Sequence, residues 1–119
     1  WLKLTDLYQA ALEFSPNNPI LQEGYGTFLI SCPDKNLRNP KQARDFSERA
    51  LINFRSDVQI QVAAGKSLAM SYFELNENGK ALYYINKTIE VAKSARFPDD
   101  YITSLKDVLS EFQSIINSK

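Results

Sequence analysis

A short run of small and apolar residues occurs three times in this chain of 119 residues, and it limits the possible folds more than any other feature. Its small residue (Ala11, Ala50 or Thr88) precedes a large apolar one, and the three copies lie 39 and 38 positions apart. A helical unit that recurs in this way cannot bury its apolar face alone and has to stack on its neighbours. The spacing therefore predicts a stack of similar units.

Apolar residues recur at spacings of three and four along six segments, which is the pattern of amphipathic helices. No segment alternates apolar and polar residues long enough to predict a strand. We predict a single all-α domain over residues 1–119. Its helices are expected near residues 4–14, 19–31, 40–54, 56–75, 81–91 and 98–117.

Several of these helices carry start and stop signals. Asn18 and Asn39 are each followed by a proline, which suits a capping residue before the first helical position. Gln42 is expected to reach back to the backbone N–H of Asn39, and Ser56 is expected to cap the fourth helix in the same way. Gly79 is expected to provide a left-handed turn before the fifth helix.

Small residues within the predicted helices indicate close helix packing. The packing positions are Gly26, Leu29, Ala43 and Ala50 in one unit and Ala69, Tyr72, Ala81 and Thr88 in the next, all of them small except Leu29 and Tyr72. With these residues, the chain over 4–93 resembles the tetratricopeptide repeat family. The resemblance implies an α-α superhelix, a solenoid of antiparallel helix pairs with about two full repeats, a preceding half repeat and a C-terminal capping helix. The segment 32–40 resembles a lengthened inter-helix turn found in some bacterial members.

The sequence departs from the family in places. Its spacing exceeds the usual ~34 residues, so the extra residues are expected in loops such as 32–39 and 55–61. Gln22 falls where a large aromatic residue is common, and Thr88 replaces a usual alanine.

Composition excludes several classes of function. Basic and acidic side chains number 14 each, so the strongly positive charge of a nucleic-acid-binding protein is missing. The chain has no histidine, which excludes Ser-His-Asp and Cys-His catalysis and His-ligated zinc. Cys32 is the single cysteine, so no internal disulfide or cysteine-based metal cage is possible. Its lone thiol fits a reducing compartment such as the cytoplasm, and it fits a disulfide-free secreted fragment equally well.

No apolar run approaches the ~20 residues of a membrane-spanning helix, so no membrane partner is expected. The acidic pair Asp99–Asp100 is interpreted as favourable charge at a helix start rather than as a catalytic pair. No enzyme activity and no cofactor are expected.

The resemblance implies that the first helix of each pair lines a concave surface. The residues expected to contact a partner there are Glu23, Thr27, Ile30, Lys66, Ser67, Met70 and Phe73. An exposed apolar patch usually marks a contact surface, although the helix at 98–117 could instead fold over it. Lys66 stands alone, so the Lys/Asn cluster with which some family members grip C-terminal carboxylates is not expected here.

We expect a non-catalytic protein–protein interaction module that binds a peptide or partner domain in its groove. The alternative is a structural role, in which the end of the array stacks on missing repeats or on a second copy to form a homo-oligomer. Trp1 lies within an amphipathic pattern, so the chain is expected to be a piece of a longer protein.

Overall fold

The computed structural model describes residues 1–119 and contains six α-helices and one short 3-10 helix. The helices are α1 (Leu2–Phe14), α2 (Pro19–Ser31), η1 (Lys35–Leu37), α3 (Pro40–Asn53), α4 (Val58–Glu74), α5 (Asn78–Ser94) and α6 (Asp99–Asn117). There is no strand, so the all-α prediction is confirmed. The six predicted segments match the six α-helices, with small shifts at their ends.

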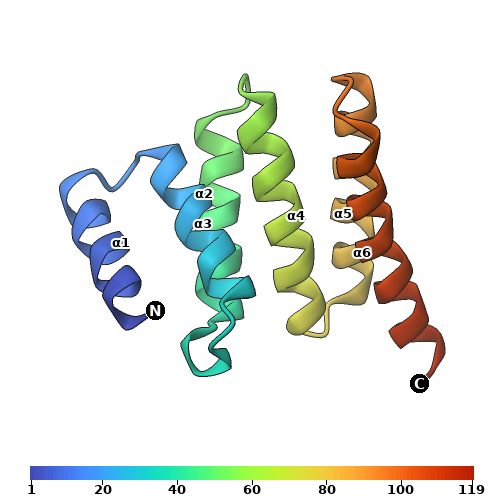
Figure 1. The fold of residues 1–119 in the computed structure, drawn as a ribbon, viewed down its shortest axis with the longest axis horizontal. Helices are drawn as coiled ribbons and strands as arrows, with labels where there is room; N and C mark the ends of the chain where they lie inside the picture. Colours follow the sequence, from blue (N-terminus) through green and yellow to red (C-terminus); the bar gives the residue numbers. More distant parts are fainter.

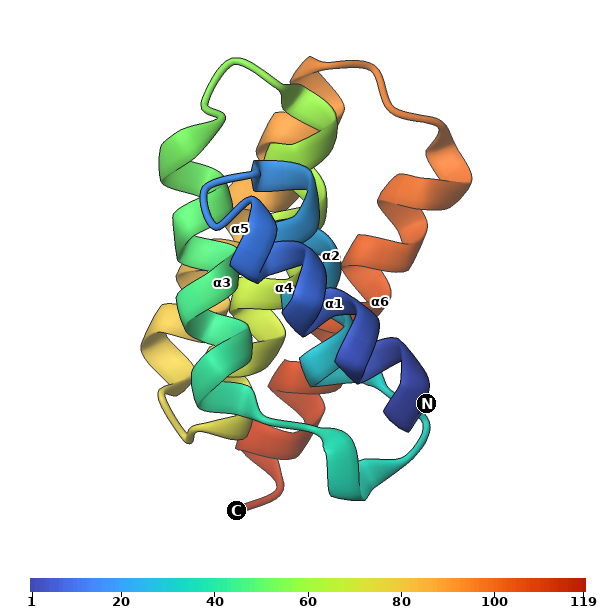
Figure 2. The same ribbon diagram turned by 90° about the vertical axis from the view of Figure 1, so that its left-hand side faces the viewer.

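Consecutive helices run in opposite directions, and each packs on the next one along the chain (Figure 1). In addition, α2 packs directly on α4, while α1 packs mainly on α2 at one end of the molecule. Viewed from that end, α3 and α5 lie on one side and α2 and α6 on the other, with α4 between them (Figure 2). The helices therefore form two layers, and α4 contributes to both faces.

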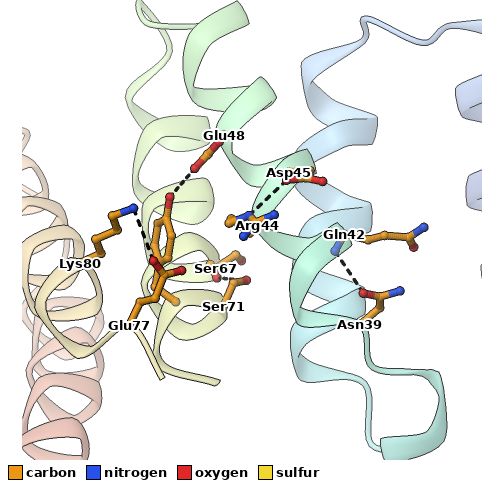
Figure 3. Close-up of polar contacts among 10 residues, drawn as sticks. Asn39, Gln42, Arg44, Asp45, Glu48, Ser67, Ser71, Glu77 and Lys80 are labelled. Atoms are coloured by element: carbon orange, nitrogen blue, oxygen red, sulfur yellow. Dashed lines mark hydrogen bonds and ion pairs between the residues drawn. The ribbon is translucent and has the colours of Figure 1, made fainter. Parts of the chain in front are cut away.

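Two of the predicted helix starts are built as expected. The side-chain oxygen of Asn18 accepts hydrogen bonds from the backbone N–H groups of Ile20 at 2.9 Å and Leu21 at 3.3 Å. The side-chain oxygen of Asn39 accepts one from the N–H of Gln42 at 3.1 Å (Figure 3). Each cap satisfies N–H groups that the first turn of a helix leaves free.

Three predicted details of the helix ends are wrong, one each at the starts of α3, α4 and α5. The side chain of Gln42 does not bond to the N–H of Asn39, which donates to the carbonyl of Leu29 at 2.8 Å instead. Ser56 belongs to the turn after α3, so Asp57 caps α4 and accepts from the N–H of Ile60 at 3.2 Å.

Gly79 lies in the first turn of α5, and the left-handed residues are Asn76 and Arg96. Both follow a helix end that closes with paired backbone bonds. After α4, for example, the N–H of Glu77 donates to the carbonyl of Tyr72 at 2.9 Å. This closure requires the left-handed backbone immediately after the helix, earlier than Gly79.

The eight small or packing residues of the two units are all buried. Gly26 illustrates why small side chains are needed, because a Cβ there would lie 2.7 Å from Ser47 Oγ. Gly65 has the same role between α4 and α5, where a Cβ would overlap Thr88 Oγ1. The helix pairs α2–α3 and α4–α5 thus approach closely at glycines 39 positions apart.

Gln22, the unusual polar residue at an expected aromatic position, is completely buried. Its amide nitrogen donates to the carbonyl of Pro16 at 2.9 Å, and its amide oxygen accepts from Asn53 Nδ2 at 3.1 Å. Because a buried amide has to be hydrogen-bonded, Gln22 ties the α1–α2 connection to the end of α3.

Candidate functional site

The expected contact residues of α2 and α4 surround a small cleft of about 180 Å³. Its lining contains six of the seven residues named from the sequence: Glu23, Thr27, Ile30, Lys66, Ser67 and Met70. Ser31, Ala63 and Tyr101 complete it. The cleft therefore lies between α2 and α4, with the start of α6 at its edge.

A chain of hydrogen bonds crosses this cleft and joins its two walls. Thr27 Oγ1 donates to Glu23 Oε1 at 2.9 Å and lies 2.7 Å from Ser67 Oγ. Since the one hydroxyl proton of Thr27 is directed to Glu23, Ser67 donates to Thr27. The second carboxylate oxygen of Glu23 and the ammonium group of Lys66 have no partner in the protein.

Tyr101 was not expected at this site. Burial of its ring, and secondly the nearby carboxylate of Glu23, raise the pKa of the Tyr101 hydroxyl above its ordinary value. Only the path of α6 brings this side chain to α2, so no sequence pattern could have identified it.

Phe73, the seventh expected contact residue, is not part of the cleft. Its ring stacks on Phe112 of α6, with ring centroids 4.3 Å apart and planes inclined by 12°. Ile30 lines the cleft but is only 3% exposed. The last helix thus covers part of the apolar surface that was expected to contact a partner.

A second polar cluster joins α3, α4 and α5 (Figure 3). The Tyr72 hydroxyl donates to the carboxylate of Glu48, and the Tyr72 ring stacks on Tyr84 at 5.6 Å. Burial raises the pKa of Tyr72, and Glu48 raises it further. Nearby ion pairs join Arg44 Nε to Asp45 at 3.2 Å and Lys80 Nζ to Glu77 at 3.5 Å. The Tyr72 contacts hold the three helices together, whereas each ion pair is local to a single helix or its cap.

Other chemically interesting residues lie apart from one another. Cys32 is buried, and its backbone carbonyl accepts from Arg38 Nε at 2.7 Å. Asp99 and Asp100 are exposed in the first turn of α6, and Asp100 accepts from the N–H of Tyr101 at 3.0 Å. No three potential metal-ligating side chains gather anywhere in the structure.

Two larger pockets lie on the other face of the molecule. One, of about 470 Å³, is formed by α3, α4 and α5, and the other, of about 370 Å³, by α1, α2 and α3. None of the six helices combines the length and apolarity that crossing a bilayer requires.

Comparison with protein-family models, curated proteins and solved structures gives no match to this chain. The resemblance to the tetratricopeptide repeat family therefore stays a prediction.

Proposed function

We propose that this chain is a non-catalytic protein-interaction module, a tetratricopeptide-type helical solenoid that binds an extended peptide in the cleft between α2, α4 and α6. One observation carries the proposal: six residues that the resemblance assigns to a concave surface line a single cleft. They come from α2 and α4, which are separated by α3 in the sequence. A chance selection of residues from two such helices would not line one cleft.

The cleft suits a peptide better than a cofactor. Pockets for small molecules usually measure ~300–1,000 Å³, whereas this cleft has about 180 Å³, space for a side chain and its adjoining backbone. The unpaired oxygen of Glu23 accepts hydrogen bonds and the unpaired ammonium of Lys66 donates them. A peptide backbone supplies the complementary N–H and carbonyl groups to both.

Peptide-library panning followed by fluorescence anisotropy tests the proposal. Ala63→Arg places a long side chain in the cleft, and Lys66→Glu reverses its one cation. We expect either change to weaken selected peptides at least about tenfold, as when a central contact is lost. Ala10→Arg, the matched control, lies on the exposed side of α1 and should leave binding unchanged.

Selected peptides that bind both cleft variants as well as the original protein would refute the cleft as the binding site. Reproducible catalysis by the purified chain would refute the non-catalytic assignment.

A second candidate is self-association through the outer side of α1. Two large apolar side chains on one side of α1 are exposed there, Leu7 and Phe14, and Phe14 is 91% exposed. Patches of this kind often mark a protein contact. Sedimentation velocity at high micromolar concentration tests this candidate: a dimer that Leu7→Glu dissociates would support it, and a monomer would exclude self-association through α1.

A further inference from the structure

The pocket formed by α3, α4 and α5 has an unbalanced positive charge. It contains about 470 Å³ and is lined by α3 and α5, which lie on the opposite side of α4 from α2 and α6 (Figure 2). Its lining includes two cations, Arg55 and Lys87, and no acidic residue, although the charges of the whole chain sum to zero. Neither cation forms an ion pair within the protein.

The rest of the lining is mainly apolar. Leu51, Ile52 and Val91 line the pocket beside the two cations, and Ile52 is 63% exposed. Gln61 supplies the main free polar group. Its amide nitrogen donates to the carbonyl of Arg55, while its amide oxygen has no hydrogen-bond partner. An occupant should therefore combine an anion, an apolar group and an N–H donor.

The pocket between α1 and α3 provides an internal comparison, because repeat-equivalent residues line both. The equivalent pairs are Leu12 and Leu51, Phe46 and Tyr84, and Arg49 and Lys87. The two pockets differ in charge. At two equivalent positions, the α1–α3 pocket has Glu13 and Pro16, whereas the α3–α5 pocket has Ile52 and Arg55. One acid thus balances one cation between α1 and α3, whereas two cations are unbalanced between α3 and α5.

We propose that the α3–α5 pocket binds an acidic peptide segment in which a carboxylate side chain adjoins an apolar one. The carboxylate lies between Arg55 and Lys87, which give charge-assisted hydrogen bonds. The apolar side chain packs on Leu51, Ile52 and Val91, and a backbone N–H donates to the Gln61 oxygen. A fatty acid supplies the first two groups and lacks the third. The volume falls within the ~300–1,000 Å³ of pockets that enclose ligands of this size.

An NMR titration of the ¹⁵N-labelled chain tests this directly. The probes are acetyl-Leu-Glu-Leu-Glu-amide and its neutral match acetyl-Leu-Gln-Leu-Gln-amide. The acidic peptide should shift the amide signals of Gln61, Gly65 and Thr88 with saturation in the millimolar range. The neutral peptide should bind at least about fivefold more weakly, because two charge pairs are lost.

Variants assign the effect to the pocket. Arg55→Glu with Lys87→Glu should abolish the shifts. The matched double reversal Lys41→Glu with Lys106→Glu, at exposed unpaired lysines elsewhere, should keep them. Thermal melting verifies that both double variants fold.

The proposal would be overturned by equal binding of the neutral peptide, by absence of shifts at millimolar peptide, or by shifts with decanoate but not with the acidic peptide. The cleft variant Lys66→Glu should leave these shifts unchanged, so failure here is distinguishable from failure of the cleft. Shifts that map to Thr27 and Ser67 would place the peptide in the cleft and refute the α3–α5 site.

Discussion

The close approach of α4 and α5 at Gly65 permits a quantitative prediction. A Cβ on residue 65 overlaps Thr88 Oγ1, while the Thr88 Cβ and Cγ2 atoms would lie at ordinary contact distances of 3.4 and 3.5 Å. The hydroxyl cannot rotate away freely, because it donates to the carbonyl of Tyr84 at 2.7 Å. Gly65→Ala therefore has two opposing effects on stability. Overpacking lowers the free energy of unfolding by ~1–3 kcal/mol, and the higher helix propensity of alanine raises it by ~1 kcal/mol.

Adding ~1 kcal/mol for the strained or lost Thr88 hydrogen bond, we expect Gly65→Ala to lower the free energy of unfolding by about 2 kcal/mol. For a chain of this size the melting temperature should fall by roughly 6–10 °C. Thr88→Ala removes the overlapping hydroxyl. In that background Gly65→Ala should be neutral or stabilising by up to ~1 kcal/mol.

Urea unfolding of the four proteins in this cycle measures the coupling between the two positions. Gly79→Ala is the matched control, since a Cβ on this helical glycine meets nothing within 4 Å and should not destabilise the protein. The reasoning is refuted if Gly65→Ala raises the stability of the original protein, or if its cost is the same with and without the Thr88 side chain.

Three further changes test other contacts. Gln22→Ala removes the hydrogen bonds of the buried Gln22 amide to the carbonyl of residue 16 and the amide of residue 53, so urea unfolding should show a loss of ~1–3 kcal/mol; a neutral result would contradict a stabilising role of these bonds. Asp57→Ala should cost ~1 kcal/mol through loss of the α4 cap, whereas Ser56→Ala should stay within ~0.5 kcal/mol; a larger cost for Ser56→Ala than for Asp57→Ala would contradict Asp57 as the cap. The raised pKa of Tyr72 means that the unfolded chain loses this proton first, so stability should fall as pH rises above about 10. Tyr72→Phe should reduce that fall in urea unfolding at alkaline pH, and an unchanged pH profile would exclude Tyr72 as its source.

The contrast between the two faces bears on how a partner would be recognised. On the cleft side, Glu23 and Lys66 oppose each other in charge and favour a polar peptide backbone. On the other face, Arg55 and Lys87 favour a negative side chain. Binding at the second face should therefore weaken with added salt more than binding in the cleft, because screening acts most strongly on exposed, unbalanced charge.

Local sequence signals were sufficient for the helices and for most of the residues buried between them, although Leu7 and Phe14, which share the apolar spacing of α1, are exposed. Apolar spacing reports which side of a helix is buried, and side chains such as Asn18 and Asn39 cap N–H groups within three residues of themselves. The burial of Ala43 and Ala81 follows from the same short-range periodicity. Such features depend on the chain within a few turns, so they could be predicted without knowing how the helices meet.

The sites depended on contacts between distant segments. Tyr101 reaches the cleft and Phe112 stacks on Phe73 only because α6, which packs mainly on α5, also comes close to α4, and nothing in either helix alone specifies that contact. Arg55 and Lys87 come together across 32 positions of sequence because α3 and α5 both pack on α4. The sequence alone determined which surfaces of each helix are apolar, small or charged. Only the tertiary structure decided which of those surfaces face one another, because helix packing depends on how side chains from separate helices fit together.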